Sequence, residues 1–276
     1  MKFFGQVTAA AIFAISLQAA NITVYPGSSW TEQSTAGCPC NSSINGNMPR
    51  NGTGSLEIIG PRSRFALGDV TSFTTNLGLL SNLTAFSYDF LTSNLGSAPP
   101  NSYPIARLHL FDPTNSYVSE LVWENAETGN VAFSTGTWQS YNVFASGSIY
   151  RFVNFYIGPP PSGFGIRRTF NGPGPADAQT VQSIAAWSAN TTSPLFNESA
   201  NGGLNQFGFS AQTYVVGVSL GIGGGATNYL GYADNVTLAF GNNSDTFNFE
   251  AIPEPSTYAL MALGLGLMAA RIRKRR

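Results

Sequence analysis

Two glutamates and one histidine are the residues of this chain that could do acid–base chemistry. Glu120 and Glu124 are four apart in a strand-like segment, and His109 is the only histidine among 276 residues. Residues four apart in a strand share a face, with Cα atoms roughly 13 Å apart at about 3.3 Å per residue. Glycoside hydrolysis uses carboxyl groups roughly 5 to 9.5 Å apart, so we favour a solvated sheet face over a glycosidase pair. A serine or cysteine nucleophile would have to use His109, for which we expect a structural role or a place at the rim of a sheet.

Cys38 and Cys40 are the only cysteines and are separated by one residue. An exported chain passes through an oxidising compartment, and residues two apart can lie within bonding distance, so a disulfide is permitted. Closing so small a loop would stabilise the fold by about 1 to 2 kcal/mol. A redox or metal role is the alternative, but the C-x-x-C spacing and further ligands are absent.

The aromatic residues could contact sugars. Four tryptophans and 11 tyrosines offer flat apolar faces that can stack on sugar rings while amides and carboxylates bind hydroxyl groups. We single out Trp30, Trp123 and Trp138 for such contacts. Packing in an aromatic core is the alternative for all three, and for Trp123 it is the interpretation that we prefer.

The segments that contain these residues show the alternation of apolar and polar side chains that is typical of β-strands. In residues 83–92, Thr84, Phe86, Tyr88 and Phe90 alternate with smaller or polar residues, which is typical of a half-buried strand. Similar runs, separated by Pro, Gly, Asn and Ser clusters, occupy residues 105–111, 118–124, 139–144, 150–157, 214–222 and 236–240. One segment, residues 178–188, has helical spacing instead, with Asp177 as its expected N-cap. The sequence therefore predicts an all-β jelly-roll or lectin-like sandwich with one short helix, formed by residues 21–252.

Two segments of this region resemble the first and last strands of jelly-roll carbohydrate-binding or lectin-like modules. They are Gly52-Thr53-Gly54-Ser55-Leu56-Glu57-Ile58 and Gly231-Tyr232-Ala233-Asp234-Asn235-Val236-Thr237-Leu238. The resemblance implies that Asp234 could be a ligand for a structural calcium ion, a hard cation that takes several oxygen ligands. Glu57 and Glu250 are further candidate ligands, although no D-x-D-x-D loop accompanies them.

The charged residues are distributed unevenly along the chain. Residues 21–252 contain seven arginines, no lysine and 13 acidic residues, a difference of −6, whereas the whole chain has a formal net charge of −1. Because phosphate neutralisation needs clustered lysine or arginine, this composition argues against nucleic acid as a partner. Disorder and a coiled coil are also disfavoured, since apolar content is high and 30 glycines and 16 prolines would interrupt long helices.

The N-terminus has the layout of a secretory signal peptide. Lys2 gives a basic start, residues 7–17 form an apolar run, and Gln18, Ala19 and Ala20 precede a cleavage position after Ala19 or Ala20. A first buried helix is the alternative, but the run is too short to span a bilayer. We therefore expect residues 1–20 to be removed on export.

The C-terminus has three parts. Pro253, Glu254 and Pro255 are followed by 15 uncharged residues, 256–270, which are compatible with a short or tilted membrane helix. The chain ends in a basic cluster that should stay on the cytoplasmic side, formed by Arg271, Arg273, Lys274, Arg275 and Arg276. An ordinary tail anchor that stays uncut is one interpretation of this segment.

The same tail resembles the PEP-CTERM sorting signal of Gram-negative bacteria that produce exopolysaccharide. The resemblance implies that exosortase, a membrane-embedded cysteine transpeptidase, cuts near the Pro-Glu-Pro and releases or transfers the protein to the cell surface. The body also resembles a group of uncharacterised PEP-CTERM surface proteins. The matching pieces are residues 104–108, 121–124, 135–141, 234–236 and 248–250.

These features predict three segments: a signal peptide (1–20), a β-sandwich (21–252) and a sorting or transmembrane segment (253–276). We expect a non-enzymatic surface or extracellular-matrix protein that exosortase processes, with transient attachment to the inner membrane and exopolysaccharide as its candidate partner. A lectin-like carbohydrate-active hydrolase and a purely structural coat component are the alternatives. Calcium is the one cofactor that the sequence suggests.

Overall fold

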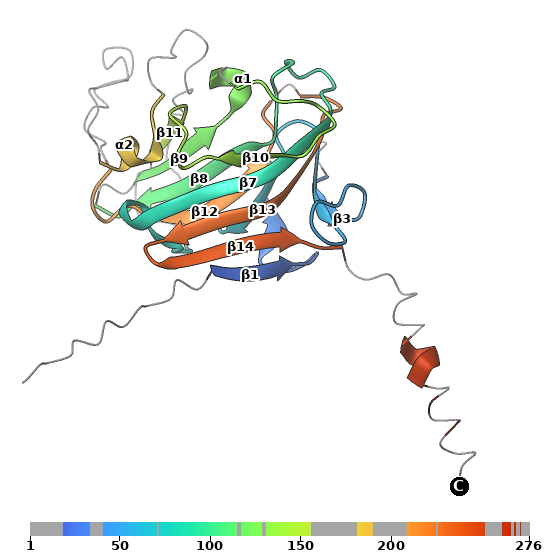
Figure 1. The fold of residues 1–276 in the computed structure, drawn as a ribbon. Helices are drawn as coiled ribbons and strands as arrows, with labels where there is room; N and C mark the ends of the chain where they lie inside the picture. Colours follow the sequence, from blue (N-terminus) through green and yellow to red (C-terminus); the bar gives the residue numbers. More distant parts are fainter. Residues whose placement is uncertain are drawn as a thin grey trace, which may run out of the picture.

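The protein folds into two β-sheets that pack face to face (Figure 1). The structure is a computed structural model, which describes residues 19–33, 41–70, 72–114, 117–128, 131–155, 181–189, 209–224 and 226–251, with 261–265, 268 and 271 near the C-terminus. Each sheet has seven strands. The predicted all-β sandwich is confirmed.

The first sheet, called sheet A, is organised around its longest paired strands, β7 and β13. It contains β10 (Gln139–Asn142), β7 (Leu83–Asn94), β13 (Leu230–Phe240), β14 (Asn243–Phe249), β1 (Ala19–Val24), β4 (Ser55–Ile59) and β3 (Ser43–Asn45). One edge of β13 pairs with β7, while the other edge pairs with β4 and then with β14. Figure 1 shows β10, β7, β13, β14 and β1 following one another across the near side.

The second sheet, called sheet B, is antiparallel throughout. It contains, in order, β11 (Tyr150–Phe155), β9 (Tyr117–Trp123), β8 (Ile105–Asp112), β12 (Tyr214–Gly221), β5 (Arg64–Gly68) and β2 (Trp30–Glu32), with β6 (Gly78–Leu79) also paired to β12. A bulge in β12 lies between Val215 and Gly217. Val215 and Val218 therefore both belong to the main core, and Val216 packs with Phe111 in a separate cluster. The single alternating face predicted for residues 214–222 is interrupted at this bulge.

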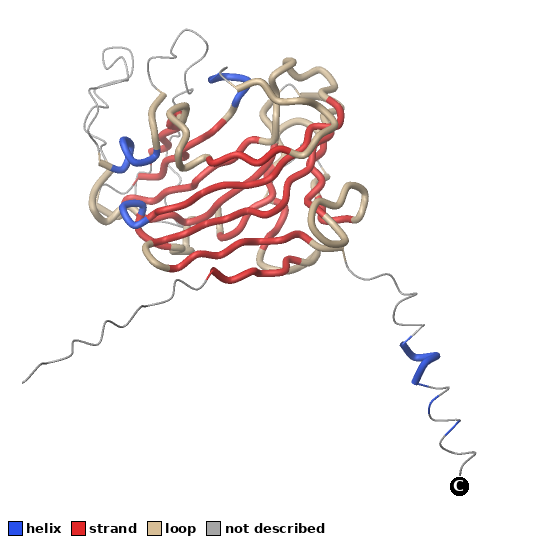
Figure 2. Tube along the Cα trace, viewed as in Figure 1, coloured by secondary structure: helices blue, strands red, loops and turns tan. Residues whose placement is uncertain are grey.

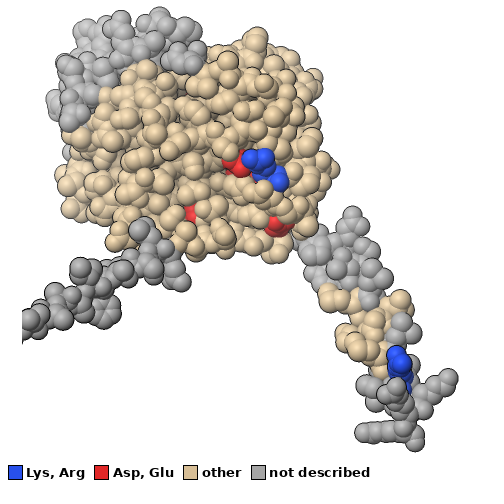
Figure 3. All heavy atoms as spheres, in the orientation of Figure 1, with Lys and Arg blue, Asp and Glu red and all other residues tan. Residues whose placement is uncertain are grey.

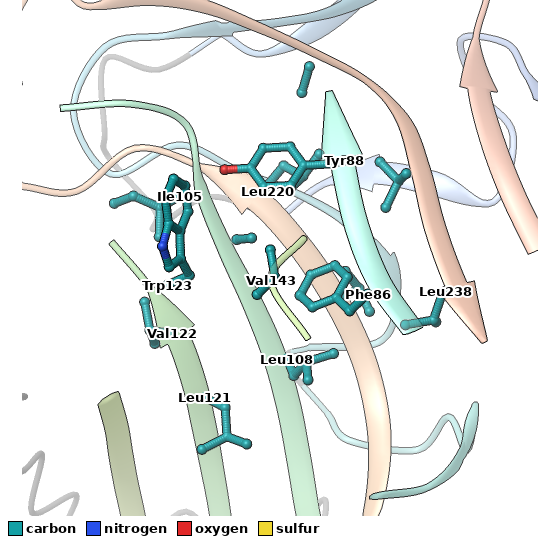
Figure 4. Close-up of a cluster of buried hydrophobic side chains, with 14 of the residues drawn as sticks. Phe86, Tyr88, Ile105, Leu108, Leu121, Val122, Trp123, Val143, Leu220 and Leu238 are labelled. Atoms are coloured by element: carbon teal, nitrogen blue, oxygen red, sulfur yellow. The ribbon is translucent and has the colours of Figure 1, made fainter. Parts of the chain in front are cut away.

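The core between the sheets combines aliphatic and aromatic side chains (Figure 4). Phe86, Tyr88 and Phe90 of β7 are at most 1% exposed, as their alternation predicts. The Trp123 ring stacks on Tyr141 of the other sheet, with ring centroids 4.2 Å apart. Contacts of this kind join the two sheets and fix the positions of the side chains on their outer faces.

Three short helices join the strands in the described chain, rather than the one predicted (Figure 2). They are η1 (Leu80–Asn82), α1 (Asn125–Thr128) and α2 (Ile184–Ser188). The helix predicted over residues 178–188 corresponds to α2 but begins later, because the Ser183 hydroxyl accepts a hydrogen bond from Ala186 N–H and caps it. Asp177, the predicted cap, lies outside the described residues.

The strands with jelly-roll resemblance are neighbours but not the ends of the fold. Strand β4 pairs with β13, with Ile59 opposite Leu230. The described chain places β1, β2 and β3 before β4, and β14 after β13. Strand β1 lies parallel to β14, with Ala19 opposite Ser244 and Val24 opposite Phe249. The first residue of β1 and the last residue of β14 therefore lie at opposite ends of this strand pair.

Near the C-terminus, residues 261–265 are helical. Within the described chain, none of the helices combines the length and apolar character that crossing a bilayer requires. The membrane helix expected over residues 256–270 stays a prediction.

Candidate functional site

The outer face of sheet B carries a polar cluster. Ala106 and Leu108 of β8 point into the core, so Arg107 and His109 between and beyond them point to the opposite face. Five further polar side chains from four neighbouring strands or their ends interact with this pair. The Arg107 cluster is the set formed by Arg64, Arg107, His109, Glu120, Glu124, Tyr150 and Ser219.

His109 is held between two strands. Its Nε2 lies 2.7 Å from Ser219 Oγ of β12, and its Nδ1 lies 3.5 Å from Glu120 Oε1 of β9. The side chain is 0% exposed, which lowers the pKa of His109 even though Glu120 opposes the shift. The imidazole is therefore neutral at pH 7. Its position agrees with the structural role predicted for it and not with a place at the rim.

Glu120 is paired with Arg64. Arg64 Nη1 and Nη2 donate to the two carboxylate oxygens at 3.0 and 3.3 Å, and the arginine side chain reaches past β12 and β8 to do so. Burial by itself would raise the pKa of Glu120, but the charges of His109 and Arg64 outweigh it and lower the pKa. Arg64 is a permanent cation and keeps Glu120 ionised even when His109 is neutral. With a side chain 12% exposed, Glu120 is not on the solvated face that we expected.

Glu124 follows β9 and is bound by a tyrosine. Tyr150 of β11 donates a short hydrogen bond to Glu124 Oε2, and burial followed by the charge of Glu124 raises the pKa of Tyr150. Gly223 packs against the other oxygen, where an added Cβ would lie 2.7 Å from Glu124 Oε1. Glu120 and Glu124 thus both have specific protein partners.

Arg107 is a buried cation, and within the described chain its Nη1 lacks a hydrogen-bond acceptor. The residue is 6% exposed, and among the described residues nothing accepts a hydrogen bond from its buried Nη1. Burial and then the nearby Arg64 lower the pKa of its guanidinium, while Glu124 and Glu120 act in the opposite direction. An arginine still stays protonated in proteins, so the cluster contains a buried cation with one donor nitrogen, Nη1, that no described residue accepts from.

A second polar group lies on the outer face of sheet A. Asp89 of β7 accepts hydrogen bonds from Arg50 Nε at 3.0 Å, Asn235 Nδ2 at 2.8 Å and Ser140 Oγ at 2.5 Å. The Arg50 guanidinium carbon lies 5.8 Å from the ring centroid of Trp138, which precedes β10 and is half-buried. We call these five residues the Trp138 site. On the side of the molecule seen in Figure 3, one group of basic atoms on the body lies directly against acidic atoms, other acidic atoms lie apart, and most of the surface is uncharged.

The backbone of β13 adapts to this site. Its register against β7 shifts between Asp234 and Thr237, and Asn235 adopts a φ of +49°. Asparagine tolerates this left-handed conformation better than most residues. The bulge lets Asn235 donate to Asp89 while its own N–H donates to Asp234.

The three candidate calcium ligands are bound by protein donors. Asp234 is 0% exposed and accepts from the backbone N–H groups of Asn51, Asn235 and Phe249. Burial raises the pKa of Asp234 to about 6; these hydrogen bonds oppose the shift and the charge of Glu250 adds to it. Glu250 accepts from Thr53 and Asn248, and Glu57 accepts from Asn47 and Tyr232. Among the described residues, no three His, Cys, Asp or Glu side chains gather as a metal site.

Two of the three tryptophans considered for sugar stacking belong to the core. Trp30 and Trp123 are each 1% exposed, and Trp30 packs edge-on against Phe249 with centroids 5.1 Å apart. A sugar ring cannot reach either of them, which rules out Trp30 as a stacking residue and agrees with the core packing that we preferred for Trp123. Trp138 remains as the candidate. Among the other described residues before position 252, Tyr25 at 43% is the only large hydrophobic side chain that is exposed.

Several predicted residues lie outside the described part of the chain. They are Cys38 and Cys40, residues 1–18 of the signal peptide, and Pro253, Glu254, Pro255, Arg273, Lys274, Arg275 and Arg276 of the tail. Ala19 and Ala20 form the start of β1, and Arg271 is helical and exposed.

The comparison with protein families concerns the end of the chain. A family model described as "PEP-CTERM protein-sorting motif" matches residues 251–276, which follow β14. This chain carries a PEP-CTERM sorting motif. The motif implies export of the protein and its processing by exosortase before it reaches the cell surface.

The body has weaker likenesses to known proteins. No curated protein matches the sequence. Among solved structures, the chain is similar to one described as "Cellulose induced protein, Cip1", with 13% identity over 76% of this chain and 90% of that chain and a TM-score of 0.33.

The PEP-CTERM motif begins where the folded body ends. Glu250 N–H donates to Val24 O at 2.9 Å, and Thr53 Oγ1 donates to Glu250 Oε2 and lies 3.3 Å from Ala251 O. The chain is therefore part of the sandwich up to Ala251, two residues before the Pro-Glu-Pro.

Proposed function

We propose that the mature protein is a non-enzymatic component of the cell surface or extracellular matrix that binds exopolysaccharide through the Trp138 site. The PEP-CTERM motif supports the exported location. The observation that carries the binding role is the half-buried Trp138 ring beside Arg50 and Asp89 on the outer face of sheet A.

The chemistry of the Trp138 site suits a sugar. An indole face contacts the apolar C–H side of a sugar ring, while guanidinium, carboxylate and amide groups beside it bind hydroxyl groups. Arg50 is 35% exposed at its side chain and Ser140 is exposed, so both can reach a ligand. Asp89 orients Arg50, Asn235 and Ser140 before any ligand arrives, which reduces the ordering cost of binding.

The glycosidase alternative has less support. A glycosidase that uses two carboxyl groups needs one of them protonated at the working pH, with a raised pKa. Glu120 has a lowered pKa because of its charged neighbours, and Glu124 accepts a hydrogen bond from Tyr150. The two residues are better suited to holding the Arg107 cluster together.

Co-sedimentation with exopolysaccharide from the producing bacterium tests the binding proposal. We expect the processed protein to bind, Trp138→Ala to lower the affinity by about tenfold, and Trp138→Phe to retain most of it, because stacking contributes on the order of 1 to 3 kcal/mol. Tyr25→Ala is the matched control, since it removes an exposed aromatic ring away from the site. Equal binding by Trp138→Ala and the unchanged protein would refute the assignment of the site, and absence of binding would favour a purely structural coat component.

A further inference from the structure

Arg107 is the strongest unexplained feature on the outer face of sheet B. The carboxylates nearest to it already hold other donors, since Glu120 accepts both N–H groups of Arg64 and Glu124 accepts the hydroxyl of Tyr150. Among the described residues, the buried Nη1 of Arg107 is left without an acceptor. A buried donor without an acceptor is costly, and where a native fold retains one, a bound water, ion or ligand is a reason for it.

The charges around Arg107 define the kind of ligand. Arg64 and Arg107 carry two positive charges, and Glu120 and Glu124 carry two negative ones, while His109 is neutral. Arg64 lies close enough for its charge to act on Arg107, so an anion between the two guanidinium groups would be attracted by both. The two glutamates would repel a dianion such as phosphate more strongly than a monoanion.

The geometry of arginine selects among monoanions. A guanidinium presents parallel N–H donors that match the two oxygens of a carboxylate. The hydroxyl groups of Ser219 and Tyr150 already hold His109 and Glu124, so the ligand group that the cluster can accept is the one that the arginines bind. A carboxylate matches these donors, and in a polysaccharide it is carried by an acidic sugar.

We propose that Arg107, together with Arg64, binds the carboxylate of an acidic sugar, so that the exopolysaccharide recognised by this protein contains uronic acid residues. The inference rests on the proposed function for the identity of the polymer. It concerns the opposite sheet from the Trp138 site, and the two sites can therefore be tested separately. Arg64, with a side chain 32% exposed, is the outer of the two arginines, and its movement would admit the ligand.

The experiment uses calorimetric titration of the processed protein with defined saccharides. The probes are an oligomer of glucuronic acid, the matching neutral glucose oligomer and inorganic sulfate. We expect binding of the uronic acid oligomer to exceed that of the neutral oligomer at least tenfold, and Arg107→Gln to abolish this preference. Arg107→Lys should also lose most of it, because lysine keeps the charge but not the paired donors. Arg62→Gln is the matched control, since Arg62 is exposed and its replacement changes the net charge equally.

The thermal stability of the same variants separates a binding role from a structural one. Because Nη1 of Arg107 has no acceptor among the described residues and burial disfavours its charge, Arg107→Gln should leave Tm unchanged or raise it. If Arg107→Gln does not fold, Arg107 has a structural role and the inference is refuted. The inference also fails if the uronic acid oligomer binds no better than the neutral one, if sulfate binds as well, or if Arg107→Gln keeps the preference. In that case, binding of the neutral oligomer that depends on Trp138 would still support the proposed function. If instead the uronic acid oligomer binds through Arg107 and Trp138→Ala has no effect on binding, only the assignment of the Trp138 site is refuted.

Discussion

His109 Nε2 lies 2.7 Å from Ser219 Oγ, and this contact joins β8 to β12 on the outer face of sheet B. Both residues are 0% exposed, so neither can replace the other's hydrogen bond with water. A buried polar group that loses its partner costs about 1 to 3 kcal/mol.

Replacing Ser219 with alanine should therefore reduce the free energy of unfolding by about 1 to 3 kcal/mol, because His109 Nε2 is left without its partner. Denaturant unfolding followed by tryptophan fluorescence measures the change. Ser81→Ala, at an exposed position, serves as the control and should change stability by less than about 0.5 kcal/mol. A similar effect of both substitutions would contradict a specific role for the Ser219 hydroxyl.

The interactions of Glu120 with His109 and Arg64 should give a pH-dependent contribution to stability. Because the pKa of Glu120 is lowered from 4.5 in the folded protein, the unfolded chain binds a proton more readily. The contribution is complete above pH 4.5 and is lost as the pH falls further. The stability difference between the unchanged protein and Glu120→Gln, measured from pH 7 to pH 3, should shrink below pH 4.5. A stability difference that stays constant over this range would refute these two interactions as the source.

Calcium should have little effect on the folded body. The oxygens of Asp234 already accept three backbone N–H groups, and Glu57 is held by Asn47 and Tyr232, so a calcium ion would have to displace protein donors. We expect Tm at pH 7 to be the same in EGTA and in millimolar calcium. A calcium-dependent rise in Tm at pH 7 that weakens at pH 5 would restore the calcium site, because protons compete with the metal at a carboxyl whose pKa is raised to about 6.

Processing of the tail should give a mature protein that ends near Ile252. The folded body extends to Ala251, and the sorting motif occupies residues 251–276. Mass spectrometry of the released protein should therefore show a chain that begins at Ala20 or Asn21 and lacks the terminal basic cluster. Retention of Arg276 in the released protein would mean that the tail is an ordinary anchor.

The alternation of apolar residues was enough to predict most long strands of the sandwich. Phe86, Tyr88 and Phe90 show why, since each second residue must enter the core when one face of a strand is buried. The same rule could not predict the bulges at Val215 and Asn235, because each depends on the partner strand. It also missed short edge strands such as β2 and β3, which have too few residues to show a period.

The candidate sites were harder to predict than the fold. The alternation of Arg107 and His109 with apolar neighbours indicated a polar face on β8, but Arg64, Tyr150 and Ser219 come from distant parts of the sequence. Their approach depends on the strand order of sheet B. Trp30 and Trp138 have the same residue type, and only their positions in the fold separate a core residue from a candidate sugar contact.

The central claim, binding of exopolysaccharide without catalysis, is tested most directly by incubating the processed protein with exopolysaccharide from the producing bacterium. Bound protein and newly formed reducing ends are measured in the same sample. We predict saturable binding with no increase in reducing ends over the protein-free control. Release of reducing ends that disappears in Glu124→Gln would contradict the account and identify a hydrolase.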